Sequence, residues 1–202
     1  MLSLNFTPFP VLTTDRLLLR QFTLDDAPSL QRLRSNEDTM KYINRPLTIT
    51  IEDAQNWIAV ILDALTKNEG ISWCICLKED PAEHVGSIGF WRIEKEHFRA
   101  EIGYMLTPSL RAKGIMFEAL QAVIEYGFKG LSLHSVEAHI DPRNEASAAL
   151  LKKGGFVQEA YFKENFYLRD HFADTAIFSL LNPYDRKGED SVEDKRMESS
   201  IA

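Results

Sequence analysis

The length, composition and charge of the chain exclude several classes of protein. A chain of 202 residues with 45% hydrophobic residues can bury one well-packed core but hardly two full domains. The net charge of −7 comes without a cluster of lysines and arginines in the body of the chain, so a nucleic acid is not expected as a partner. The acidic balance suits a cationic substrate, but ordinary solubility explains it equally well.

Signals for membranes, secretion and metals are also missing from the sequence. No apolar run approaches the about 20 residues that a membrane helix requires, and residues 1–11 lack the basic and apolar regions of a signal peptide. Cys74 and Cys76 lie two apart in a strand-like stretch, so they share one face without the further ligands of a zinc site. The five histidines show no metal-ligand spacing. We therefore expect a reduced, cytoplasmic, metal-free protein.

Hydrophobic periodicity predicts a single α/β domain with a mixed central sheet. About seven strands are expected, at residues 16–22, 72–77, 84–92, 99–106, 136–140, 156–161 and 174–181. Helices are expected after an entry at residues 23–26, and over residues 50–65, 117–128 and 144–154. The middle strands form an antiparallel meander, and the later ones are joined through helices. The charged segment from Asp185 onward has few large apolar groups, so we expect a domain over residues 1–184 and a disordered tail over residues 185–202.

The segment at residues 107–116 has the features of an anion-binding loop. A loop that leads from a strand into a helix presents free backbone N–H groups, and the helix dipole adds about half a positive charge there. Gly114 allows a ligand to approach closely, and Arg111 and Lys113 add positive charge. Neither a Walker ending nor a glycine-rich turn after the first strand is present, which argues against a P-loop or a dinucleotide fold. On spacing alone, a simple basic loop with a glycine turn explains the segment equally well.

Several motifs around this loop together resemble the GNAT superfamily of N-acetyltransferases. The first set is Ala100-Glu101-Ile102-Gly103-Tyr104-Met105-Leu106, then Pro108, Arg111-x-x-Gly114-x-Met116 and Glu118-Ala119-Leu120. The second set is Asn144-Glu145-Ala146-Ser147 followed by Gly155-Phe156. The opening Thr13-Thr14-Asp15-Arg16-Leu17-Leu18-Leu19-Arg20 is similar to the ribosomal-protein N-terminal acetyltransferase branch (RimJ/RimL-like). The resemblance runs from about Leu12 to about Leu181, and the order and separation of the motifs make it far more specific than any one of them.

The resemblance implies a GNAT fold and a binding site for acetyl-CoA. In that family, the strand that matches residues 99–106 (the fourth) splays from the strand that matches residues 136–140 (the fifth). The pantetheine arm lies between these strands and pairs with backbone at the position of Leu106. The pyrophosphate is held by backbone N–H groups at the positions of Ala112, Lys113, Gly114, Ile115 and Met116, next to Arg111. The position of Asn144 commonly touches the cofactor near its thiol, and a plain helix N-cap is an equally good and compatible interpretation.

Three positions depart from the family pattern. Ala112 replaces a usual glycine and Phe117 a common threonine, but neither change removes a backbone N–H, so cofactor binding should survive. Leu151 stands where many members carry a tyrosine as the general acid toward the departing thiolate. Ser147, which the RimJ/RimL-like branch shares, is the candidate for that role, with local helix capping as the structural alternative.

Glu101 is the candidate for general base or amine anchor. It lies mid-strand among apolar neighbours, where an ionised carboxylate is costly unless it has a partner or a function. A structural ion pair with Arg99 or Arg92 is the other interpretation, and it has slightly more weight. Glu164 is a weaker candidate for the base.

The expected reaction is the transfer of an acetyl group from acetyl-CoA to a primary amine. Deprotonating an α-amine at pH 7 costs about 1 kcal/mol, against about 4–5 kcal/mol for a lysine. A site with few groups able to take a proton therefore favours a protein N-terminus as the acceptor. Small amines such as polyamines, amino sugars or antibiotics are the alternative acceptors, and an acyl-CoA-binding module without activity is the alternative function.

Acceptor selection is expected from the helix at residues 50–65 and a loop at residues 162–172, while Tyr104 and Trp91 either line the site or pack. No nucleic-acid or membrane partner is expected, and the sequence leaves a homodimer open.

Overall fold

The computed structural model describes residues 1–43, 45–168 and 170–184, and over these ranges the chain forms a mixed sheet of eight strands in the order β1-β2-β3-β4-β5-β6-β8-β7. The strands are β1 (Leu12–Thr13), β2 (Leu17–Arg20), β3 (Ile71–Leu77), β4 (Gly86–Glu94), β5 (Arg99–Leu106), β6 (Ser135–Ile140), β7 (Val157–Leu168) and β8 (His171–Leu181). Neighbours pair antiparallel except β5 and β6, which are parallel. The predicted α/β fold with a mixed sheet is confirmed, and the additional strand is the two-residue β1.

The helices begin and end where the sequence supplies capping groups. They are α1 (Ala27–Ser35), α2 (Glu37–Met40), α3 (Ile51–Thr66), α4 (Ile115–Lys129) and α5 (Glu145–Lys153), with 3-10 turns η1 (Leu24–Asp26) and η2 (Pro108–Leu110). The start of α3 is a capping box, because the Asp53 N–H donates to Thr50 Oγ1 at 3.0 Å and the Thr50 N–H donates to Asp53 Oδ2 at 2.8 Å. Of these elements, α2 has no counterpart among the predicted helices.

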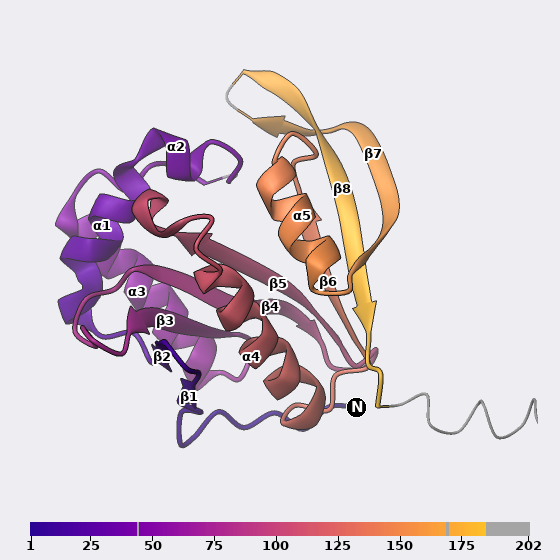
Figure 1. Ribbon diagram of the computed structural model, residues 1–202, viewed down its shortest axis with the longest axis horizontal. Coiled ribbons are helices and arrows are strands. Elements are labelled where there is room, and N and C mark those ends of the chain that lie inside the picture. Colours follow the sequence, from indigo (N-terminus) through magenta and orange to yellow (C-terminus); the bar gives the residue numbers. More distant parts are fainter. Residues whose placement is uncertain (44, 169, 185–202) are drawn as a thin grey trace, which may run out of the picture.

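Helices cover both faces of the sheet, and each face has its own core (Figure 1). On the face that packs against α4 and α5, here called the α4 face, Trp73 and Phe90 are buried against α4 residues such as Leu120. On the opposite face, here called the α3 face, Ile58 of α3 packs with Cys74. Side chains alternate along each strand, so successive residues of β5 point to different faces. This alternation decides on which side each candidate catalytic group lies.

The parallel strands β5 and β6 pair over only part of their length. Their register is Arg99 with Ser135, Ala100 with Val136 and Glu101 with Glu137. Beyond Glu101, β5 stays paired with β4 as far as Leu106, but its other edge has no strand partner among the described residues. We call this region, residues 102–106 of β5 and 138–140 of β6, the β5/β6 splay. The splay predicted from the family resemblance is therefore present.

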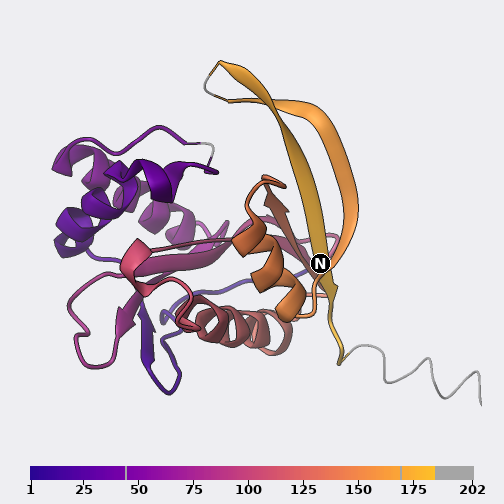
Figure 2. The same cartoon turned by 45° about the horizontal axis from the view of Figure 1, so that its top comes forward.

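The prediction of a loop at residues 162–172 is wrong, because β7 and β8 continue through most of it as a long antiparallel hairpin. Figures 1 and 2 show the far end of this hairpin projecting beyond the rest of the sheet. The polar run around Glu164 looks like a loop in the sequence, but it is an irregularity between Phe162 and Phe166 in the pairing of β7 with β8. Glu164 accommodates it with a φ of 48°.

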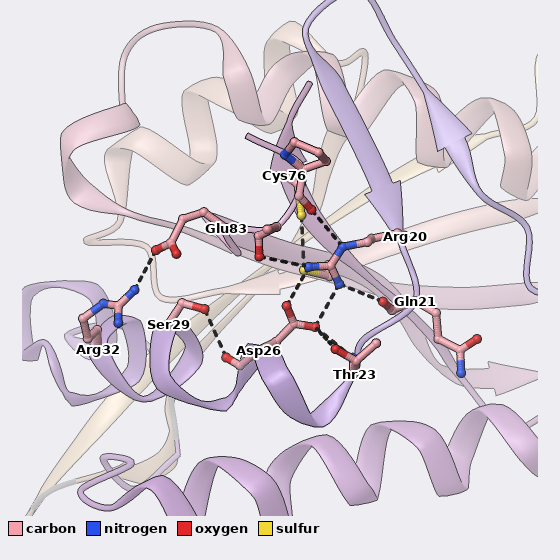
Figure 3. A network of polar contacts seen from close by, with 11 residues as sticks. Arg20, Gln21, Thr23, Asp26, Ser29, Arg32, Cys76 and Glu83 are labelled. Carbon is pink, nitrogen blue, oxygen red and sulfur yellow. Dashed lines mark hydrogen bonds and ion pairs between the residues drawn. The ribbon is translucent and has the colours of Figure 1, made fainter. Parts of the chain in front are cut away.

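A partly buried ion pair fixes the end of β2 against the start of α1 (Figure 3). Arg20 Nη2 lies 2.6 Å from Asp26 Oδ1, and the Thr23 N–H donates to Asp26 Oδ2 at 2.8 Å. Burial opposes the ionisation of Asp26, but the hydrogen bonds from Arg20 and Thr23 lower the pKa of its carboxyl below the ordinary value. Cys74 and Cys76 lie close by with their sulfurs 3.6 Å apart, which confirms that they share a face.

The predicted tail, residues 185–202, lies outside the described residues, so the domain limits stay a prediction. Across the part of the chain that the structure describes, no helix combines the length and the apolar character needed to cross a membrane.

Candidate active site

The loop between η2 and α4 presents a row of unpaired backbone donors. Among the described residues, no protein acceptor bonds the N–H groups of residues 112–117, and the first helical bond of α4 runs from the Glu118 N–H to the Gly114 oxygen at 3.1 Å. Ala112 and Gly114 both have left-handed backbones, with φ of 58° and 76°. These alternating conformations turn successive N–H groups toward one side, as in anion-binding nests. The positive end of the α4 dipole adds to the attraction for an anion.

Two arginines support this loop from different directions. Arg111 Nη1 lies 2.5 Å from Asp38 Oδ2, so it ties the loop to α2 and its charge is already balanced. Arg16 was not foreseen as part of the site. Its Nη1 donates to the Lys113 oxygen at 3.0 Å, and its Nη2 lies 2.6 Å from Glu118 Oε2. Burial opposes the ionisation of Glu118, but hydrogen bonds from Thr14 and Arg16 lower the pKa of its carboxyl.

The open edge of β5 directs backbone groups into the splay. The Thr107 N–H donates to the Val85 oxygen at 2.9 Å, on the side of β4. Because hydrogen-bonding direction alternates along a strand, the N–H and C=O groups of Tyr104 and Leu106 point the other way, toward the splay. Leu106 thus has the orientation that pairing with an extended ligand chain requires.

Asn144 and Ser147 lie at the start of α5, which follows β6. The Asn144 side chain caps the helix by accepting the Ser147 N–H at 3.1 Å, so its N-cap interpretation is confirmed. Its contact with a cofactor stays a prediction. The Ser147 hydroxyl does not cap the helix but forms a 2.7 Å hydrogen bond with Tyr104 Oη of β5. Burial raises the pKa of Tyr104 to about 12, although the bond with Ser147 acts to lower it.

Glu101 lies on the α3 face at the last paired position before the splay. It is 4% exposed and forms a 2.8 Å ion pair with Arg92 Nη1. The structure therefore selects Arg92 of the two predicted partners. Glu164, the weaker candidate for the base, is exposed on β7, and its N–H donates to Asp174 Oδ1 at 2.8 Å.

Two residues that the sequence did not single out join Glu101 on this face. Oxygen or nitrogen atoms of Glu101, Glu137 and His139 all lie within 4.8 Å of one another. His139 Nε2 is 3.3 Å from Glu137 Oε1 but makes no hydrogen bond there. Such groups can hold a cation, but Arg92 already neutralises Glu101, so an ion pair accounts for that carboxylate in this arrangement.

The two candidate catalytic groups therefore lie on opposite faces of the sheet. Glu101 pairs with Trp91 in register and points to the α3 face, whereas Tyr104 pairs with Ile88 and points to the α4 face with Ser147. In the splay, β5 and β6 are no longer joined by hydrogen bonds, so the sheet does not close off one face from the other there. A group lying in the splay could be approached from the α3 face and could release a product toward the α4 face.

Comparison with known proteins gives the family. Residues 16–157 match the domain described as Acetyltransferase (GNAT) domain. The chain belongs to the GNAT family of acetyltransferases. It is 35% identical to the uncharacterized N-acetyltransferase YoaA of Bacillus subtilis over 87% of this chain and 98% of YoaA. A GNAT-family acetyltransferase structure from Bacillus anthracis superimposes with a TM-score of 0.76 at 30% identity, covering 86% of this chain and 99% of that one.

A relative of known acceptor matches more locally. The chain is 31% identical to the [ribosomal protein uS5]-alanine N-acetyltransferase of Escherichia coli over 105 residues, which is 52% of this chain and 54% of that enzyme. The predicted family, its RimJ/RimL-like relatives and the acetyl-CoA-dependent N-acetyltransferase class are thus confirmed.

One departure from the GNAT pattern is explained by packing. Leu151, at the position where many members carry the tyrosine acid, is fully buried in the core on the α4 face. A hydroxyl cannot serve from there without disturbing this core. Tyr104 and Ser147 form a hydroxyl pair that joins β5 to α5.

Proposed function

We propose that this GNAT enzyme transfers the acetyl group of acetyl-CoA to the α-amine of a protein N-terminus. The observation that carries the proposal is the row of unpaired N–H groups at residues 112–117, next in the chain to a strand whose edge is open from residue 102 to residue 106. The first feature suits a pyrophosphate and the second an extended pantetheine chain.

The residues of the loop fit the charge of the cofactor. The N–H groups from Ala112 to Met116 and the α4 dipole would bind the pyrophosphate oxygens. Lys113 is exposed at the same loop and can add positive charge, whereas Arg16 and Arg111 are paired with Glu118 and Asp38 and serve mainly to hold the loop in place. The side chain of Asn144 retains its amide donors, because only its oxygen is used to cap α5.

The opposite placement of the candidate groups fits a direct transfer. The amine nitrogen attacks the thioester carbon from the α3 face, the N–C bond forms and the C–S bond breaks. Glu101 takes the proton from the amine, directly or through water, or anchors the amine as an ammonium before it is deprotonated. The Leu106 N–H can polarise the carbonyl oxygen.

Ser147 and Tyr104 serve the leaving thiolate on the α4 face. Tyr104 is protonated at neutral pH, as a tyrosine ordinarily is, and its hydrogen bond with Ser147 supports the Ser147 hydroxyl as a donor. A hydroxyl is a much weaker acid than a thiol, so stabilising the thiolate by hydrogen bonding is more favourable than giving it a proton. The thiolate then takes its proton from water.

The local similarity to the uS5-alanine enzyme of Escherichia coli supports a protein N-terminus as the acceptor. Glu101, the candidate base, is already paired with Arg92, which makes it a weak base for deprotonating an amine. An α-amine needs about 1 kcal/mol to be neutral at pH 7, whereas a lysine needs about 4–5 kcal/mol.

Thiol release from acetyl-CoA with a panel of acceptors tests this function. The panel contains ribosomal-protein N-terminal peptides, the same peptides blocked at the N-terminus but carrying a lysine, polyamines and amino sugars. The proposal expects thiol release and a matching acetylated product with the free N-terminal peptides, well above the blocked ones. Turnover with small amines alone would contradict the proposed protein acceptor. If no amine raises thiol release above the rate of acetyl-CoA hydrolysis, the chain is an acyl-CoA-binding module without transferase activity.

A further inference from the structure

A cluster of arginines and tryptophans lies on the α3 face beside Glu101. Arg34 of α1 stacks on Trp57 of α3 with its guanidinium carbon 4.2 Å from the ring centroid. Arg45, in the segment before α3, lies 5.8 Å from the Trp57 ring and 5.4 Å from the Trp91 ring. We call Arg34, Arg45, Trp57 and Trp91 the Arg/Trp cluster.

The Arg/Trp cluster is continuous with the candidate catalytic carboxylate. Trp91 is the register partner of Glu101, and its ring covers Gly103, where an added Cβ would lie 3.9 Å from the indole. Arg92 completes the connection, because its guanidinium carbon is 5.4 Å from the Trp91 ring and its Nη1 is 2.8 Å from Glu101. An acceptor whose amine lies near Glu101 can therefore reach this cluster across Trp91.

Among the arginines that the structure describes, the two in the cluster differ from the rest by having no carboxylate counter-ion. Within the described ranges, every other arginine forms an ion pair with a carboxylate, namely Arg16, Arg20, Arg32, Arg92, Arg99, Arg111 and Arg143. No such pair involves Arg34 or Arg45 in the same part of the chain. In a chain with a net charge of −7, this unpaired positive charge is local to the α3 face.

The lack of a counter-ion is most unusual for Arg34, because its side chain is buried. It is 2% exposed, and its Nε donates to Thr48 Oγ1 at 2.9 Å, with no hydrogen-bond acceptor for its terminal nitrogens among the described residues. Burial, and then the charge of Arg45, lower the pKa of Arg34 to about 10. A buried guanidinium without an anion is unfavourable, whereas an anion at the edge of the guanidinium accepts two of its in-plane N–H donors, in the bidentate manner typical of arginine.

We propose that Arg34 and Arg45 bind an anionic group of the acceptor, a carboxylate or a phosphate, with Trp57 and Trp91 holding the two guanidinium groups in place. The acceptor is then a primary amine that carries an acidic group close to that amine. This inference rests on the proposed function, because it places the acceptor amine at Glu101.

The competing explanation is that the cluster only packs, with each guanidinium stabilised by the tryptophan rings. Packing gives no reason for the enzyme to distinguish acceptors by charge. Charge discrimination among acceptors of equal size therefore separates the two explanations.

The experiment measures kcat/KM for matched acceptors that differ in one acidic group. The pairs are N-terminal peptides with Asp or Asn at the second position, free amino acids against their amides, and phosphoethanolamine against ethanolamine, so that the arms distinguish a peptide carboxylate, a free carboxylate and a phosphate. We expect at least about tenfold preference for the acidic member in one arm. Equal turnover of both members in every arm would overturn this inference and leave the proposed function standing. Absence of turnover with any amine would instead remove the proposed function, and this inference with it.

Variants of Arg45 then assign the preference to the cluster. Arg45 is exposed, so its replacement need not disturb folding. Arg45→Gln should lower kcat/KM for the acidic acceptor about tenfold or more while changing the neutral one less than about threefold, and Arg45→Glu should reverse the preference toward amines with a basic group. Arg32→Gln is the matched control, since Arg32 lies on α1 but pairs with Glu83 at 2.6 Å. A wild-type preference in Arg45→Glu, or an equal effect of Arg32→Gln, would contradict the assignment.

Discussion

Tyr104 of β5 and Ser147 of α5 share a hydrogen bond of 2.7 Å between Oη and Oγ. The bond connects the strand before the β5/β6 splay with the helix after it, on the α4 face. Neither hydroxyl has another hydrogen-bond partner among the described residues. The pair thus offers hydrogen-bond donors that the buried Leu151, which stands at the usual tyrosine position, cannot provide.

Removing either hydroxyl should slow the chemical step. We expect Ser147→Ala and Tyr104→Phe to lower kcat about 10- to 100-fold, because a donor to the leaving thiolate is lost, with little change in the KM for acetyl-CoA. Tyr126→Phe is the control, since Tyr126 is a partly buried tyrosine of α4 that packs on Trp73. Steady-state kinetics check the prediction, and a full rate in Ser147→Ala would remove Ser147 from the mechanism.

Glu101→Gln should impair the use of the acceptor but not of the cofactor. The change keeps the shape of the side chain and removes its charge, so kcat/KM for the amine should fall about 100-fold while the Kd of acetyl-CoA stays the same. Glu137→Gln is the matched control, because Glu137 is the register partner of Glu101 on the same face. If Glu137→Gln proves the more damaging of the two, the base has been assigned to the wrong carboxylate.

Ala112→Gly should leave cofactor binding intact. Ala112 has a φ of 58°, which costs an L-residue about 1–2 kcal/mol, and the replacement keeps the backbone N–H. The Kd of acetyl-CoA should therefore change less than about threefold, and thermal stability should not fall. Ala112→Pro removes that N–H and cannot adopt the required φ, so it should weaken binding strongly. Equal binding by both variants, measured by calorimetry, would contradict the role of the backbone donors.

The stability of the protein should fall in mild acid because of His84. His84 is 2% exposed with both ring nitrogens unpartnered among the described residues, and burial lowers its pKa to about 4. The unfolded chain binds this proton below pH ~6.5 and the folded chain does not, so the stability present above that pH is lost as the pH falls toward about 4, by at most about 1.4 kcal/mol per unit.

Urea unfolding at pH 7.5 and pH 5 measures this effect. In His84→Leu, the loss of stability between these pH values should be smaller than in the wild type by about 2 kcal/mol. His97→Leu changes an exposed histidine and should keep the wild-type dependence. An unchanged dependence in His84→Leu would show that other groups cause it.

Features that depend on neighbours in sequence could be predicted. The helix that begins after Thr50, the Asn144 cap and the glycine turn at Gly114 are each decided within a few residues, and all three are present. The splay could be predicted only through the resemblance to the GNAT family, because no local rule predicts where two parallel strands separate.

Features that depend on distant residues could not be predicted. Arg16 reaches the Lys113 oxygen across a separation of 97 residues, and Tyr104 reaches Ser147 across 43. The hairpin at residues 157–181 was missed in part because Glu164 forms an irregularity that reads as a polar loop. The Arg/Trp cluster combines side chains from α1, the segment before α3, α3 itself and β4, so it exists only in the folded chain.

The most direct measurement is the affinity for acetyl-CoA of the wild type, Gly114→Trp and Gly155→Trp, by calorimetry. Both glycines have left-handed backbones, with φ of 76° and 87°, and in both an added Cβ meets only one side-chain atom, at 3.4 Å from Arg16 and 3.5 Å from Leu180. The two changes thus impose similar strain, but only Gly114 lies in the loop of unpaired donors. We predict that acetyl-CoA binds the wild type, that Gly114→Trp weakens binding at least about tenfold, and that Gly155→Trp weakens it less than about threefold. Binding that is unaffected by Gly114→Trp would contradict the placement of the cofactor at residues 112–116.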